Sequence, residues 1–165
     1  MKTLVLYATR TGLTYNIAQK IAGELDAEIA QISDGKDYSG FFGYIRAAIE
    51  GLKKSPRPNV PLETKEKLDA YERIILTGPI WAENWCSINR SFLKEHGKEI
   101  SCPVYFVFTH MSKITYDKCA SDADKYLNAP HKGFLTVSTH IKTDADQQAL
   151  DSALCTFIKT LSPES

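Results

Sequence analysis

The chain has 165 residues, of which 43% are apolar and 24% charged, as is typical of one globular domain with a sizeable core. Its 20 basic and 20 acidic residues give a formal net charge of zero, and the absence of a basic cluster argues against nucleic-acid binding. The apolar runs are too short to span a membrane, and Arg10 interrupts the first of them before it reaches signal-peptide length. We expect a single domain over residues 1–165, with no transmembrane segment.

Candidate metal-binding and disulfide patterns are weak. The four cysteines form no C-x-x-C pair, which makes a reduced, cytoplasmic setting the simplest interpretation. The four histidines lack ligand spacing, so we predict no metal site. Cys86 is interpreted as a small packing residue rather than a redox thiol.

Strand and helix patterns alternate along the chain. The predicted strands are Thr3–Ala8, Ala27–Ile32, Arg73–Thr77, Val104–Thr109 and Phe134–Thr139. The predicted helices are Tyr15–Leu25, Phe41–Leu52, Ile88–His96, Thr115–Leu127 and Ala145–Leu161. The first, third and fourth strands are apolar on both faces, as in a buried parallel sheet. The order of elements therefore predicts an α/β fold with right-handed crossovers.

The loop Thr9–Thr14 joins the first predicted strand to the first helix. A helix start leaves backbone N–H groups unpaired and carries partial positive charge, and a phosphate satisfies both. Thr9, Thr11 and Thr14 can add hydroxyl donors, and Gly12 permits a tight turn or a close approach. The loop lacks the Gly-Lys-Ser/Thr of nucleotide triphosphatases and the G-x-G-x-x-G of dinucleotide-binding folds. An ordinary polar turn that caps the helix is the alternative.

This loop resembles the T-x-T-G-x-T phosphate loop of the flavodoxin family. The surrounding family pattern is matched by Val5, Leu6, Tyr7, Ala18 and Ile21. Leu13 stands where many members have Asn, at a position that contributes mainly backbone. The resemblance implies a flavodoxin-like three-layer sandwich, with a five-stranded parallel sheet in the order 2-1-3-4-5 and helices on both faces. It also implies FMN as cofactor, with its phosphate on Thr9, Arg10, Thr11, Gly12, Leu13 and Thr14.

The segment Asp34–Pro61 is longer than a minimal crossover requires, and it resembles an aromatic helix found in some uncharacterised flavodoxin-family proteins. Its Phe41, Phe42 and Tyr44 are predicted to pack in the core rather than contact a ligand. The helix Phe41–Leu52 could line a pocket, cover the sheet or form a dimer face, and the sequence leaves these roles open.

The loop after the third strand resembles the second flavin loop of the family. The cofactor contacts that the resemblance implies are Pro79, Ile80, Trp81, Ala82, Glu83 and Asn84. Glu83 stands where a glycine is common. Trp81 is expected to contact the flavin, whereas Trp85 could equally be a core residue.

The loop after the fourth strand could supply backbone donors to the pyrimidine edge of the flavin through Thr109, His110 and Met111. A protonated His110 would favour an anionic reduced flavin, and a histidine that only caps the next helix is the alternative. The chain has no second aromatic residue here before Tyr116, so one flavin face is expected to be open.

The sequence thus predicts an FMN-binding redox protein and leaves its class open. It could be an electron carrier with a redox partner protein, or an NAD(P)H-dependent enzyme that resembles quinone reductases or protoporphyrinogen oxidases and reduces a small acceptor such as a quinone. The zero net charge argues against a very low-potential acidic carrier. A flavodoxin-fold binding module without redox activity is the third alternative. The sequence does not indicate an oligomeric state.

Overall fold

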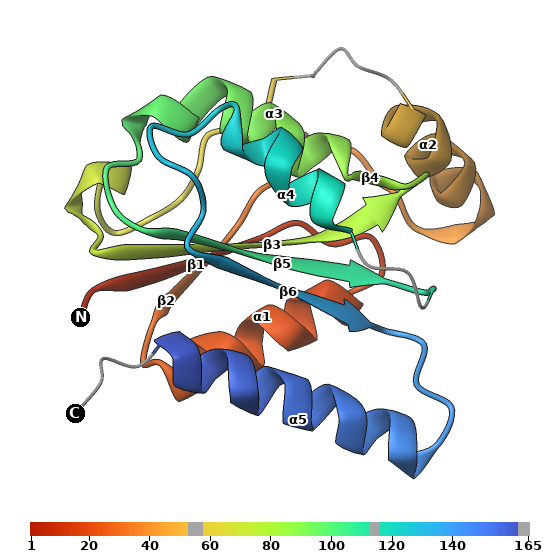
Figure 1. Ribbon diagram of the computed structural model, residues 1–165. Helices are drawn as coiled ribbons and strands as arrows, with labels where there is room; N and C mark the ends of the chain where they lie inside the picture. The colour runs from red at the N-terminus through yellow and green to blue at the C-terminus, as the bar shows by residue number, and fades with distance from the viewer. Residues whose placement is uncertain (53–57, 113–115, 162–165) are drawn as a thin grey trace.

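The computed structural model describes residues 1–52, 58–112 and 116–161, and Figure 1 shows a central sheet between two layers of helices. The strands are β1 Thr3–Tyr7, β2 Glu28–Gln31, β3 Arg73–Trp81, β4 Asn84–Trp85, β5 Val104–His110 and β6 Gly133–Ser138. The helices are α1 Leu13–Glu24, α2 Gly40–Leu52, α3 Ser87–His96, α4 Asp117–Asp124 and α5 Asp144–Leu161, with short 3-10 turns η1 Leu68–Ala70 and η2 Gly97–Glu99.

Five parallel strands follow the order β2-β1-β3-β5-β6, which is the 2-1-3-4-5 order predicted from the sequence. Val5 of β1 pairs with Ile75 of β3, and Ile75 pairs with Tyr105 of β5. The sequence missed β4, a two-residue strand that pairs antiparallel with the end of β3. The predicted third strand ended at Thr77, whereas β3 continues to Trp81.

The two faces of the sheet bury alternate residues of each strand. Leu4 and Leu6 belong to the cluster under α3 and α4, and Val5 belongs to the cluster under α1 and α5. Because both faces are covered, the central strands carry apolar residues on both faces, as expected from the sequence. Cys86 is fully buried in the first cluster, which confirms its packing role.

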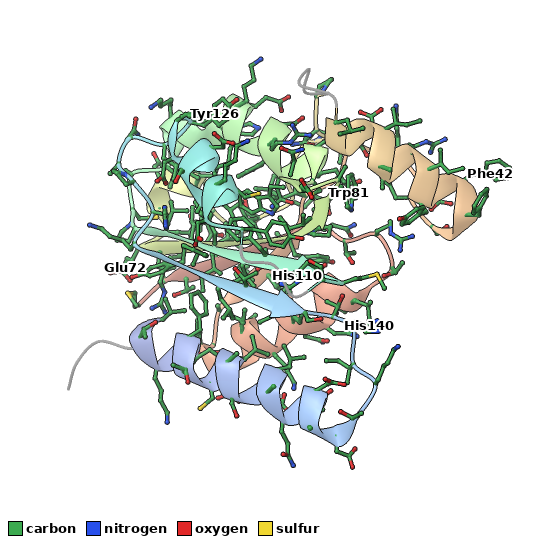
Figure 2. All side chains as sticks on the ribbon, turned by 45° about the vertical axis from the view of Figure 1, so that its right-hand side comes forward. Phe42, Glu72, Trp81, His110, Tyr126 and His140 are labelled. Carbon is green, nitrogen blue, oxygen red and sulfur yellow. The ribbon has the colours of Figure 1, made fainter. Side chains whose placement is uncertain are left out.

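Helix α2 lies beyond the carboxyl ends of the strands, beside β4 (Figure 1). The prediction that Phe41, Phe42 and Tyr44 pack in the core is wrong, because their side chains are 73%, 82% and 59% exposed. The helix instead buries Gly43, Ala47, Glu50 and Gly51. Figure 2 shows Phe42 pointing away from the body of the molecule.

Some predicted features lie outside the described residues. They are Thr115, the first residue of the predicted helix Thr115–Leu127, and residues 162–165 of the predicted domain. Within the described ranges, none of the helices has both the length and the apolarity needed to cross a membrane.

Candidate functional site

The β1–α1 loop has the geometry of an anion-binding helix start. Gly12 precedes the helix with a φ of 87°, a left-handed conformation that favours glycine. The Thr9 hydroxyl accepts a hydrogen bond from Gly12 N at 3.0 Å, and Asn16 N donates to Gly12 O at 3.1 Å. The backbone N–H groups of residues 13–15 precede Asn16 N, the first N–H group that donates within the helix, so they are the groups that a phosphate can satisfy.

A hydroxyl pair joins this loop to the end of β5. Thr14 Oγ1 lies 2.8 Å from Thr109 Oγ1, and both side chains are buried. Only one of the two hydroxyl protons is used in this contact, so the other remains able to donate. The first and third predicted loops therefore meet at one point, although Thr14 also serves to hold the sheet and helix together.

The second predicted loop is a tight hairpin. Trp81 pairs with Asn84, and the two residues between them, Ala82 and Glu83, have φ values of 47° and 63°. Positive φ at both central positions is the geometry of a type I′ turn, which matches the twist of a two-stranded hairpin. A side chain at Gly78 would come within 2.6 Å of Trp85 Nε1, so this position requires glycine.

The two tryptophans have different environments. Trp85 is buried between Phe106 and Phe108, with ring centroids 5.0 and 4.9 Å away, and it packs in the core. Trp81 packs against Tyr38 at 4.7 Å and also lines a cleft. The Nε1 atoms of both tryptophans are buried and have no hydrogen-bond partner among the described residues. Because only Trp81 lines the cleft, it is the tryptophan that can meet a ligand.

His110 is the last residue of β5 rather than part of a loop. Its ring is buried and lies 5.2 Å from the ring of Tyr116, and within the described part of the chain its Nδ1 has no partner. Burial lowers the pKa of His110 below its ordinary value, which disfavours the protonated form considered in the sequence analysis.

The carboxyl ends of β1, β3 and β5 enclose a cleft of about 210 Å³. The predicted site residues that line it are Arg10, Thr11, Leu13, Thr14, Pro79, Ile80, Trp81, Ala82, Thr109, His110 and Met111. Thr9, Gly12, Glu83 and Asn84 do not line it, and they instead form the turns that carry the lining residues. The structure thus brings three separate predicted loops to one place.

Tyr44, Ala47 and Ala48 of α2 form a fourth wall of the cleft. A pocket-lining role was one of the alternatives that the sequence left open for this helix, although none of these three residues was predicted to contact a ligand. The Arg10 guanidinium lies 5.6 Å from the centre of the Tyr44 ring, a cation–π contact between the first loop and α2. Thr139, just after β6, also lines the cleft. The surplus length between the second and third predicted strands was the sequence signal for an additional element beside the site.

The charge of the cleft is positive. Arg10 lines it, no carboxylate is among the described lining residues, and Glu83 is exposed on the turn outside it. A cation beside a helix N-terminus favours an anionic ligand.

A larger hollow of about 1,110 Å³ lies between residues 59–69 and α3. It is not at the point where the strand order reverses between β1 and β3, which is where open α/β sheets bind ligands. The smaller cleft lies at that point and has the unpaired N–H groups and the unpartnered Trp81 and His110 nitrogens. We therefore assign the candidate site to the smaller cleft.

No family profile matches the chain, and no curated protein matches it in sequence. Solved structures do match its fold. A "putative flavoprotein" from Bacteroides uniformis is 23% identical, with a TM-score of 0.70 over 90% of this chain and 97% of that one. A flavoprotein from Lactobacillus acidophilus in complex with FMN is 20% identical, with a TM-score of 0.63 over 91% and 98%. An NAD(P)H:quinone oxidoreductase from Methanothermobacter marburgensis is 10% identical, with a TM-score of 0.53 over 100% and 98%. The fold of this chain is flavodoxin-like.

Proposed function

We propose that the cleft binds FMN and that the chain is a redox protein. The observation that carries the proposal is the meeting of the phosphate-type loop with the ends of β3 and β5 at the reversal of strand order. The L. acidophilus protein, which matches over nearly the whole chain, is a flavoprotein that was solved with FMN.

The cleft residues fit the two ends of this cofactor. The N–H groups at the start of α1, the Thr11 hydroxyl and Arg10 suit the phosphate. Ile80 and Trp81 offer an apolar surface to the ring system, and the unpartnered nitrogens of Trp81 and His110 suit its polar atoms. FMN, when bound, would supply one- and two-electron transfer, and the protein would orient it and set its electrostatic environment.

The rim of the cleft suggests that a bound ring would stay accessible. Met111 and Leu13 are 65% and 45% exposed at the rim. Tyr116, the next aromatic residue along the chain, packs against His110 and is buried rather than placed over the cleft. An accessible ring would allow an electron donor or acceptor to approach it directly.

The absence of carboxylates among the described residues of the cleft lining favours an oxidoreductase over a very low-potential carrier. Carboxylates near a flavin destabilise its anionic reduced form, and the described cleft lining has none. Our more specific candidate function is therefore an enzyme that takes electrons from NAD(P)H and reduces a small acceptor such as a quinone. The fold match to a quinone oxidoreductase adds to this candidate without deciding it.

All four cysteines are free thiols in the structure. Burial raises the pKa of the Cys86 thiol to about 12, so this group is an unreactive packing residue. We propose a reduced, cytoplasmic setting for the protein on this basis.

The proposal is tested by titration of the apo protein with FMN and with riboflavin, which lacks the phosphate. Wild type should bind FMN more tightly than riboflavin. The double variant Thr11→Ala, Thr14→Ala should lose affinity for FMN by at least roughly 100-fold, because hydrogen bonds to a charged group contribute about 1.5–3 kcal/mol each. Its affinity for riboflavin should change little.

Thr14→Ser is the matched control, since it keeps the hydroxyl that meets Thr109 and should keep the affinity. Equal affinity of wild type and the double variant for FMN would contradict the proposed phosphate site. A wild-type protein that binds neither compound would leave the binding-module alternative. If FMN binds, anaerobic bleaching by NADH or NADPH alone would indicate an enzyme, whereas bleaching only through an added reductase would indicate a carrier.

A further inference from the structure

Helix α2 has its large and small residues on the opposite sides from those of an ordinary surface helix. Its buried side consists of small residues and one carboxylate, Gly43, Ala47, Glu50 and Gly51. Its exposed large apolar residues, here called the α2 stripe, are Phe41, Phe42, Tyr44, Ile45, Ile49 and Leu52. An amphipathic helix normally turns its large apolar residues inward, so this face requires another explanation.

Close packing explains why the stripe cannot turn inward. A side chain at Gly51 would come within 2.5 Å of Trp81 O, and one at Gly43 would overlap the backbone of Tyr38. Arg90 further fixes the helix by donating to the carbonyls of Glu50 and Gly51 at 3.0 and 3.1 Å. These contacts fix the orientation of α2, so the side chains of the α2 stripe remain exposed on the surface of a single copy of the chain.

The α2 stripe is large for a monomer. From the exposed fractions of its six side chains, we estimate an apolar surface on the order of 700 Å². The largest apolar patch on a typical monomer is about 300–600 Å². A stable interface buries about 800 Å² on each partner, so the stripe with its immediate rim has the area that a dimer requires.

We propose that the α2 stripe is the interface between two copies of this chain. A two-fold interface places the same surface on both sides, and an apolar stripe can pack against a copy of itself without burying an unpaired charge. Glu50 is buried on the opposite side, and Arg46 donates to the carbonyl of Asp37 at 2.7 Å. The zero net charge adds no long-range repulsion between copies and no steering toward a strongly charged partner.

The test is sedimentation equilibrium of the apo protein between about 1 and 100 μM, the range in which a micromolar dimer dissociates. Wild type should sediment at twice the chain mass of 18.5 kDa at the upper end of this range. Phe42→Glu should raise the dissociation constant by about 100-fold, because it buries an unpaired charge in an apolar interface. Circular dichroism should show unchanged folding, since Phe42 is 82% exposed.

A pair of isoleucines provides the matched control. Ile45 in the stripe and Ile141 outside it are 39% and 38% exposed. Ile45→Glu should weaken the dimer, and Ile141→Glu should leave it intact. A monomeric wild type at 100 μM, a dimer that survives Phe42→Glu, or equal effects of the two isoleucine variants would each overturn the proposal. A monomer that instead floats with lipid vesicles would also overturn it and would assign the stripe to a membrane surface. The measurement uses no FMN, so its result is independent of the proposed cofactor.

Discussion

Helices α1 and α2 both border the cleft, and both show apolar residues at helical spacing, yet they bury opposite kinds of side chain. Helix α1 buries its large aliphatic residues, Ile17 and Ile21, against the sheet. Helix α2 buries glycine and alanine and exposes its aromatic residues. Apolar periodicity therefore identified both helices, but it did not identify which side of α2 faces the protein.

The difference arises from how closely each helix approaches the part of the protein that it packs on. Helix α1 packs across the flat face of a sheet, where large side chains fill the space between the layers. Helix α2 packs closely on the backbone of Tyr38 and Trp81, where only small residues fit. Contact with a backbone edge, rather than with a sheet face, reverses the usual pattern.

The largest expected effect comes from truncation of one isoleucine in each helix. Ile21→Ala should lower the free energy of unfolding by about 2–5 kcal/mol, because it leaves a cavity in the core. Ile45→Ala should change it by less than about 0.5 kcal/mol in dilute solution, where copies of the chain do not meet. Urea denaturation measures both values. Equal losses would show that the two helices bury their isoleucines alike, contrary to the structure.

Glycine-to-alanine substitutions should reverse this order, so that the variant in α2 loses more stability than the variant in α1. Gly43→Ala in α2 should destabilise the protein by about 1–3 kcal/mol, because the added methyl group overlaps the backbone of Tyr38. Gly23→Ala in α1 has open space around it and should stabilise the protein by up to about 1 kcal/mol through helix propensity. Thermal unfolding of both variants tests this, and a neutral Gly43→Ala would mean that α2 is not closely packed.

The two turns next to these helices should respond in opposite directions. Gly12, which precedes α1, and Glu83, in the hairpin beneath α2, both have left-handed backbone. Gly12→Ala should cost about 1 kcal/mol, whereas Glu83→Gly should stabilise by up to about 1 kcal/mol. Denaturant midpoints measure both changes, and destabilisation by Glu83→Gly would indicate that the Glu83 side chain itself contributes to the fold.

The smallest expected effect concerns how the free energy of unfolding depends on pH. It comes from a residue of β5 rather than from either helix. The pKa of His110 is lowered by burial from its ordinary value of 6.5, so the unfolded chain binds the proton more readily. The stability that the neutral His110 contributes is fully present above pH 6.5, and it is lost as the pH falls through the lowered pKa of the folded state. His110→Phe should flatten the stability profile in this acidic range, as urea midpoints at successive pH values can show. An unchanged slope would mean that His110 is solvated.

Much of the fold followed from local patterns. The central strands were recognised because residues such as Val5 and Leu6 are apolar on both faces, which is the pattern of a doubly covered parallel strand. The order of the five parallel strands was also confirmed. Hairpin strand β4 was missed because its turn uses Ala82 and Glu83 in left-handed backbone, without the glycine or asparagine that normally predicts such a turn.

The sequence by itself indicated the main strands and helices and the phosphate-type loop at Thr9–Thr14, because these depend on short-range spacing and residue type. FMN as the candidate cofactor entered only through the resemblance of that loop to the flavodoxin family. Only the tertiary structure decided which side chains of separate elements contact one another and which line the cleft. It paired Thr14 with Thr109, placed Trp85 in the core and Trp81 at the cleft, and turned the α2 stripe outward. Each outcome depends on contacts with residues that are distant in sequence, such as Thr109 for Thr14, Phe106 for Trp85 and Trp81 for Gly51, so no local pattern contains it.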